Sequence, residues 1–223
     1  MTSRAPIQAT APQVVEFLRE ARLVAIIRLP DLSAALPLAQ ALIAGGFRAL
    51  EFTLNSPGAL DAIAQVSNQL PEVLRGEVAI GAGTVLRDTD AEAAIEAGAQ
   101  FIISPTIKPD VIDICKAQGI AVIPGAFTPN EIETAWELGA DVVKVFPSRA
   151  LEPKYIRELH GPFPEFKLMP TGGIELEQVR AFLEAGAWVV GVGGTALLNT
   201  QAIAAAHWDD LSTIAQRYIA ESI

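Results

Sequence analysis

The amino-acid sequence predicts an α/β fold of the (β/α)8 class, a TIM barrel, formed by a single domain over residues 1–223. A chain of 223 residues, 51% of them hydrophobic, is long enough to bury one large core and short for two. Five times along the chain, a helical pattern ends in glycine and an apolar segment follows within a few residues. Short, nearly continuous apolar segments that alternate with helices favour a closed parallel barrel over an open doubly wound sheet.

The elements follow in order from this pattern. A short helical lead-in precedes the first strand, and closing helices follow the last. Helix ends are expected at Gly45-Gly46, Gly98, Gly119, Gly139 and Gly186, because glycine readily adopts the left-handed conformation that ends many helices. In a barrel of this class, catalytic groups lie at the carboxyl ends of the strands and in the loops that follow. Strands are expected near residues 23–29, 49–54, 78–85, 101–105, 120–126, 142–147, 167–171 and 189–193.

The composition excludes several classes of partner and site. The formal net charge is −10, so neither nucleic acid nor a membrane surface is an expected partner, because both would be repelled at long range. The two histidines, His160 and His207, lie far apart and Cys115 is the one cysteine, so we expect no metal site, no cofactor and no internal disulfide. A reducing cytoplasm suits this composition. The opening segment, residues 1–6, lacks the apolar stretch of a signal peptide.

Lys144 is the one charge inside the apolar segment Val142-Val143-Lys144-Val145-Phe146. Side chains alternate along a strand, so Lys144 would point into the barrel while Val143 and Val145 face the helices. Burial lowers the pKa of an amine, and the neutral amine is the form that attacks a carbonyl to make a Schiff base. A structural ion pair is the alternative, but buried pairs rarely stabilise a fold more than apolar residues do. Lys144 is therefore the predicted nucleophile.

Glu51 is the acid in the middle of the apolar strand around residues 49–54, and it is the predicted partner of Lys144. A carboxylate near an iminium can move protons at the adjacent carbon and at a hydroxyl, and it also balances the lysine charge. A purely structural ion pair is again the alternative.

Glycine-rich loops follow the last two predicted strands. Gly172 and Gly173 precede one helical pattern, and Gly193 and Gly194 precede another. The loops after strands seven and eight of such barrels commonly bind phosphate through backbone N–H groups, although a tight turn would explain either loop alone. The pair of loops predicts a phosphorylated substrate.

Two more polar residues lie at predicted strand ends. Arg28 ends the first strand, where its guanidinium could hold a carboxylate or a phosphate; a solvated strand-end arginine is the alternative. Thr84 follows Gly81-Ala82-Gly83, where a substrate could approach the backbone closely and accept a hydrogen bond from Thr84. A simple strand-end turn explains this segment equally well.

Several motifs, in this order and spacing, resemble the 2-keto-3-deoxy-6-phosphogluconate (KDPG) aldolase family over nearly the whole chain. The resemblance implies a class I aldolase that reversibly cleaves KDPG to pyruvate and glyceraldehyde 3-phosphate. The motifs are Leu50-Glu-x-Thr-Leu54, Gly81-Ala-Gly-Thr-Val-Leu86, Ile103-Ser-Pro105, Pro124-Gly125, Lys144-x-Phe-Pro147 and Pro170-Thr-Gly-Gly-Ile174.

The resemblance also implies roles for individual residues. Lys144 would form the Schiff base, Glu51 would act as acid and base, and Thr84 would contact the pyruvyl carboxylate. Pro105 and Phe146 would line the pocket, and the four loop glycines would bind the phosphate. A cytoplasmic homotrimer of the Entner–Doudoroff pathway is the implied context.

The configuration of the substrate at C4 stays open. Many family members with phosphogluconate specificity carry arginine at the position of Asn55, and Asn55 together with Arg28 is similar to the 2-keto-3-deoxy-6-phosphogalactonate branch. Thr171 and the segment His160-Gly-Pro-Phe-Pro are similar to the phosphogluconate branch instead. A relaxed enzyme that accepts both epimers, or also 4-hydroxy-2-oxoglutarate and oxaloacetate, fits this mixture.

Two other classes of protein with the same barrel fold remain possible from the sequence. A sugar-phosphate isomerase or epimerase would use the phosphate loops with Glu51 as a simple base, and pyruvate would then not be trapped on the protein. A non-catalytic sensor of phosphorylated keto acids would bind its ligand tightly and release no pyruvate.

Overall fold

The structure, a computed structural model, describes residues 9–223, so the segment on which no signal peptide is expected lies outside it. The helices are α1 (Ala11–Ala21), α2 (Ala35–Ala44), α3 (Ala59–Gln69), α4 (Pro71–Leu74), α5 (Asp88–Glu96), α6 (Pro109–Gln118), α7 (Pro129–Glu137), α8 (Pro153–Leu159), α9 (Val179–Glu184), α10 (Thr200–Ala204) and α11 (Trp208–Glu221), with short 3-10 turns η1 (Ser148–Ala150) and η2 (Leu176–Gln178). The strands are β1 (Leu23–Ile27), β2 (Ala49–Thr53), β3 (Ala79–Gly83), β4 (Phe101–Ile103), β5 (Ala121–Ile123), β6 (Gly125–Ala126), β7 (Val143–Val145), β8 (Leu168–Pro170) and β9 (Val190–Gly193).

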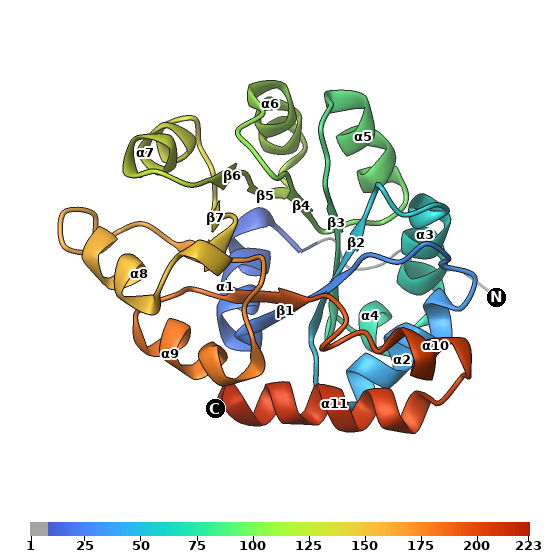
Figure 1. The fold of residues 1–223 in the computed structure, drawn as a ribbon. Helices are drawn as coiled ribbons and strands as arrows, with labels where there is room; N and C mark the ends of the chain where they lie inside the picture. The colour runs from blue at the N-terminus through green and yellow to red at the C-terminus, as the bar shows by residue number, and fades with distance from the viewer. Residues whose placement is uncertain (1–8) are drawn as a thin grey trace.

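The strands form a parallel ring with helices outside it (Figure 1). One hydrogen-bonded sheet runs in the order β5-β4-β3-β2-β1-β9 and a second in the order β6-β7-β8. A bridge between Thr171 and Gly191 joins β8 to β9, and only Pro124 separates β5 from β6. The predicted (β/α)8 class is therefore confirmed.

One predicted strand is wrong in detail. The segment 120–126 was expected to be continuous, but it divides at Pro124 into β5 and β6. Proline has no N–H to donate to a neighbouring strand, so the ladder is interrupted at this residue. The carbonyl of Pro124 still accepts a hydrogen bond from the backbone N–H of Lys144 at 2.9 Å, which keeps the two halves in one strand position of the ring.

The predicted glycine stops are confirmed. Gly46, Gly98, Gly119, Gly139 and Gly186 all have φ between +69° and +108°, in the region that L side chains rarely adopt. Each stop lets the chain turn back within a few residues to start the next strand.

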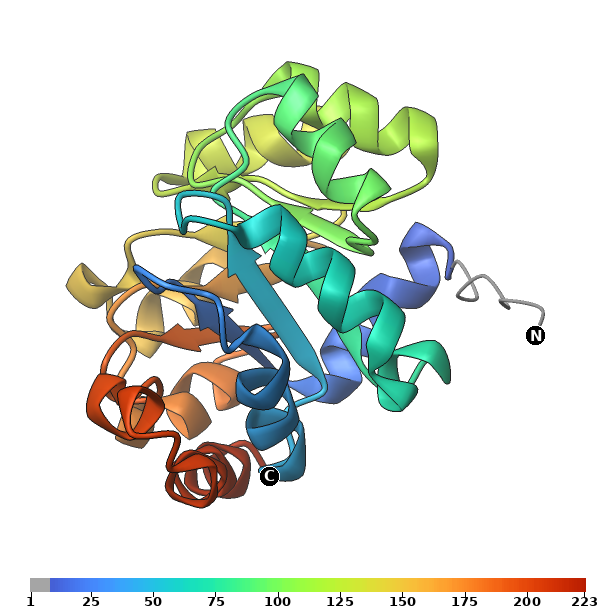
Figure 2. The same ribbon diagram turned by 90° about the vertical axis from the view of Figure 1, so that its right-hand side faces the viewer.

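Two apolar layers make up the core. One lies between the strands and the surrounding helices, and the other fills the inside of the barrel. Helix α1 closes the back of the barrel, at the right in Figure 2, and its buried Val14, Val15 and Leu18 pack in the same cluster as the interior residues Phe101 and Val142. Because α1 plugs this end, the carboxyl ends of the strands form the open mouth. In the described part of the chain, no helix is long and apolar enough to cross a membrane.

Candidate active site

Lys144 lies in the centre of β7 and points into the barrel, with a relative exposure of 4%. Val142 belongs to the interior cluster, whereas Val143 and Val145 pack in the outer layer, as the predicted alternation requires. The Nζ atom of Lys144 lies 5.1 Å from the centroid of the Phe146 ring. The amine is thus held at the mouth end of the barrel interior, away from bulk water.

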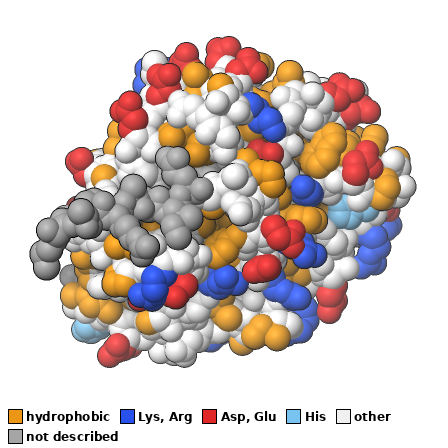
Figure 3. Space-filling view, turned by 180° about the vertical axis from the view of Figure 1, so that it is seen from behind, with side chains coloured by type: hydrophobic (Ala, Val, Ile, Leu, Met, Phe, Trp, Pro, Cys, Tyr) orange, Lys and Arg blue, Asp and Glu red, His pale blue; other side chains and the backbone are white. Residues whose placement is uncertain are grey.

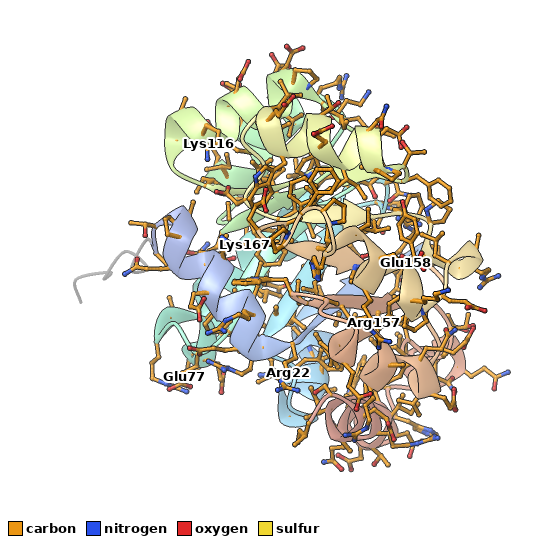
Figure 4. The ribbon with its side chains drawn as sticks, turned by 90° about the vertical axis from the view of Figure 1, so that its left-hand side faces the viewer. Arg22, Glu77, Lys116, Arg157, Glu158 and Lys167 are labelled. Carbon is orange, nitrogen blue, oxygen red and sulfur yellow. The ribbon has the colours of Figure 1, made fainter. Side chains whose placement is uncertain are left out.

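The other four lysines lie elsewhere. Lys108 caps the start of α6, and Lys116 and Lys154 form ion pairs on the outer helices. Lys167 precedes β8 on the α1 side of the barrel, where its Nζ lies 5.1 Å from the Trp188 ring (Figure 4). Among residues 9–223, Lys144 is therefore the one lysine inside the barrel.

Glu51 lies in the middle of β2 and is fully buried. Neither of its carboxylate oxygens has a hydrogen-bond partner among residues 9–223. Burial raises the pKa of Glu51, and the charges of Lys144 and Arg28 oppose that rise. Burial also lowers the pKa of Lys144; Arg28 adds to this shift and Glu51 opposes it. Both groups are pushed toward their neutral forms, which suits a nucleophilic amine beside a proton donor and acceptor.

The glycines of β3 make room for this acid. A Cβ at position 83 would overlap the carboxylate of Glu51, and a Cβ at position 81 would overlap the ring of Phe101. The sequence leaves open whether a substrate approaches this segment closely or a strand-end turn requires its glycines. At Gly81 and Gly83, side chains from the neighbouring strands β2 and β4 occupy the space that a Cβ would take.

A cavity of about 340 Å³ opens at the mouth beside Lys144. The residues of the predicted site that line it come from β1, β7, β8, β9 and the loops after them. They are Arg28, Lys144, Phe146, Thr171, Gly172, Gly173, Gly193 and Gly194. The structure therefore brings the predicted lysine and both predicted phosphate loops to one cavity.

Four predicted residues do not line this cavity: Glu51, which is fully buried, and Thr84, Asn55 and Pro105. Thr84 accepts a hydrogen bond from Nη2 of Arg28 at 3.2 Å, so its own hydroxyl hydrogen stays available to a ligand. Asn55 is exposed in the turn after β2. Pro105 is partly buried, and its carbonyl packs against Gly125.

Several loop glycines also have a packing reason to be glycine. A Cβ at Gly172 would lie 2.9 Å from the ring of Phe146, and one at Gly193 would lie 2.8 Å from the carbonyl oxygen of Ile26. Gly172 and Gly173 have positive φ as well. Close packing therefore accounts for these residues independently of any phosphate.

Arg149 lines the cavity and was missed from the sequence. It lies in η1. This turn follows β7, the strand that carries Lys144, and the cis peptide bond Phe146–Pro147 lies between β7 and η1. The rule that functional groups follow strand carboxyl ends could have found it, but no local pattern marks it. Among the described residues, no group of three His, Cys, Asp or Glu side chains could hold a metal ion.

Comparisons with known proteins agree on one family. The model of the aldolase family "KDPG and KHG aldolase" matches residues 14–214. A curated 2-dehydro-3-deoxy-phosphogluconate aldolase of Treponema pallidum is 36% identical over 205 residues, which cover 92% of this chain and 95% of the relative.

Solved structures give the same picture. The KDPG aldolase of Legionella pneumophila, with pyruvate captured at low pH as a covalent carbinolamine intermediate, matches with a TM-score of 0.81 and 29% identity over 91% of this chain and 96% of that one. A structure described as native KDPGal matches with a TM-score of 0.78 and 32% identity, over 89% of this chain and 93% of that one.

Proposed function

Because the chain belongs to the KDPG and KHG aldolase family, we propose that it is a class I aldolase that reversibly cleaves KDPG to pyruvate and glyceraldehyde 3-phosphate. One observation supports this most strongly. Lys144 and Glu51 are buried together in the barrel, and burial pushes both toward their neutral forms. The neutral amine is the nucleophile that Schiff-base chemistry needs, and a carboxyl group whose pKa is raised by burial can both accept and return a proton.

The first half of the reaction builds an electron sink. The neutral amine of Lys144 attacks the C2 carbonyl, and the resulting carbinolamine takes up a proton from water and loses water to give an iminium. Glu51, through a water, takes the proton of the C4 hydroxyl as the C3–C4 bond breaks. The electron pair of that bond moves into the iminium, so glyceraldehyde 3-phosphate leaves and an enamine stays on Lys144.

The second half returns the enzyme to its starting state. Protonated Glu51 delivers a proton to C3 of the enamine, which gives the iminium of pyruvate. Water then hydrolyses this iminium and a proton returns to the solvent, so pyruvate leaves and the neutral amine of Lys144 is free again. No hydrogen bond within the described residues holds the Glu51 oxygens, so they are available for both proton transfers.

The cavity offers a place for each charged end of the substrate. Arg28 and Thr84 lie on the Lys144 side, where they can hold the carboxylate next to C2. The glycine loops at 172–173 and 193–194 lie at the same cavity and can receive the phosphate.

We also propose the context that the family resemblance implies: a cytoplasmic, single-domain homotrimer of the Entner–Doudoroff pathway, active without a metal or cofactor.

Cleavage of the phosphogalactonate epimer is a second candidate activity, because Asn55 stands where many phosphogluconate-specific members carry arginine. Comparing the turnover of both C4 epimers by the wild type and by Asn55→Arg tests it. An unchanged epimer ratio would show that Asn55 does not set the preference.

The main test is pyruvate release from KDPG, coupled to lactate dehydrogenase. We expect steady NADH consumption by the wild type and, because the covalent step is lost, a fall of about 10⁴-fold or more in Lys144→Met. Tight KDPG binding without any pyruvate release would favour a sensor over an enzyme.

A further inference from the structure

Arg149 differs from half of the arginines in the described part of the chain, which form ion pairs with nearby acids. Arg75 and Arg87 form ion pairs with nearby carboxylates at 2.7 Å, and Arg19 pairs with Glu16. Within residues 9–223, Arg149 makes no ion pair. It lines the cavity beside Lys144 instead. Arg149 therefore brings to the cavity a positive charge that no ion pair holds, and the one acid that lines the same cavity is Glu175.

Hydrogen bonds of the neighbouring Ser148 fix the backbone from which the Arg149 side chain extends. Oγ of its buried neighbour Ser148 donates to the carbonyl of Val145 at 2.7 Å and accepts from the N–H of Thr171 at 3.0 Å. The N–H of Ser148 also donates to the carbonyl of Thr171 at 2.8 Å. These bonds tie η1 to the loop that starts at Thr171. A Cβ at Gly173 would meet Cβ and Nε of Arg149, so the arginine stem lies against this glycine loop.

The cations of the cavity divide between its two ends. Arg28 bonds to Thr84 and shifts the pKa of both Lys144 and Glu51, so it lies near the reacting centre. Arg149 contributes to neither shift and lies against the loop of Gly173. A substrate with an anionic group at each end would place one group at each arginine.

We propose that Arg149 is a specificity-determining residue that binds the distal phosphate and selects phosphorylated keto acids over unphosphorylated ones. This inference rests on the proposed aldolase function. A guanidinium can form two parallel hydrogen bonds to phosphate oxygens, which the backbone N–H groups of the glycine loops do not replace. On a chain of net charge −10, a dianion also needs such a local positive charge.

The test compares Arg149→Gln and Arg149→Lys with the wild type on KDPG and on its unphosphorylated counterpart, 2-keto-3-deoxygluconate. We expect Arg149→Gln to raise KM for KDPG about 10- to 100-fold with kcat nearly unchanged, the usual cost of a lost charged hydrogen bond. KM for the unphosphorylated substrate should not change, and Arg149→Lys should restore part of the KDPG affinity. Arg157→Gln is the matched control, because Arg157 lies on the outer helix α8 (Figure 4) and does not line the cavity.

Binding of inorganic phosphate, measured by calorimetry, separates this inference from the proposed reaction. We expect phosphate to bind the wild type and Arg157→Gln equally and to bind Arg149→Gln at least about tenfold more weakly. Equal phosphate affinity in Arg149→Gln, or an equal rise of KM for both substrates, would overturn the role of Arg149. Failure of the wild type to cleave KDPG would overturn the proposed reaction instead, while the phosphate measurement would still decide the role of Arg149.

Discussion

At the scale of single residues, the proposed chemistry depends on two buried groups, Lys144 and Glu51, whose pKa values move toward each other. Burial lowers the pKa of Lys144 from 10.5 and raises that of Glu51 from 4.5. Both shifts lower the folding stability, because a buried ionisable group stabilises the fold less than an apolar one of the same size. In the proposed mechanism, this loss of stability accompanies the larger neutral fraction that makes the amine reactive.

The pH dependence of Schiff-base formation follows from these shifts. The neutral fraction of Lys144 grows as pH rises through its lowered pKa, so the trapping rate with pyruvate should reach half of its plateau value below pH 10.5. Glu51→Gln removes a charge that raises this pKa and should move the curve to lower pH. Arg28→Gln removes a charge that lowers it and should move the curve to higher pH. Rates of borohydride trapping against pH check both signs, and shifts in the same direction would contradict the electrostatic account.

Glu51→Gln should also separate the covalent step from cleavage. Glutamine has nearly the same shape but cannot move a proton, so we expect KDPG cleavage to fall about 10²- to 10⁴-fold. Trapping of pyruvate on Lys144 should survive, because attack on the carbonyl requires only the amine. The coupled assay and mass spectrometry measure the two steps separately. If cleavage kept its full rate, Glu51 would be only a structural partner of Lys144.

At the scale of elements, β3 positions the acid of β2. Gly83→Ala would place a methyl group on the carboxylate of Glu51, which is fully buried in the barrel. We expect a loss of about 1–3 kcal/mol in unfolding free energy and a large fall in kcat. Gly161→Ala is the control, since its nearest neighbour is the carbonyl oxygen of Glu158 at 3.2 Å. Urea unfolding with the coupled assay checks both; normal activity in Gly83→Ala would mean that Glu51 needs no such space.

The elements also show what the sequence could predict. Glycine-ended helices and apolar strands are local patterns, so the order of elements and the burial of Lys144 were predictable. The break at Pro124 was missed because the apolar run around it is continuous, although the missing N–H is visible in the sequence. The role of Gly83 depends on a side chain of the neighbouring strand, and Arg149 lies in an irregular turn. Contacts of this kind depend on the closed barrel and have no periodic pattern.

At the scale of the whole molecule, the barrel has two different ends. Helix α1 closes the back, where cationic and acidic side chains are mixed on the surface (Figure 3) and Arg180 and Arg22 donate to backbone carbonyls of the C-terminal segment. The mouth carries the cavity, which is lined by Lys144, two arginines, Arg28 and Arg149, and one acid, Glu175. The closed end stabilises the molecule, and the arginines at the open end suit the proposed anionic substrate.

The proposed homotrimer is also tested on the whole molecule. Light scattering on the eluting protein should give about three times the mass of one chain, 23.6 kDa. The measured mass should not change when the protein is diluted through its working concentrations. A mass equal to one chain would contradict the trimer and leave the cavity, which one chain forms by itself, unaffected.

The most direct test of the account is reduction of the wild type with borohydride in the presence of pyruvate, followed by peptide mass spectrometry. We predict one reduced pyruvyl adduct per chain, on Lys144, and none in Lys144→Met. The other four lysines serve as internal controls, because they lie outside the barrel interior. An unlabelled protein, or an adduct on any of those four, would contradict the central role of Lys144.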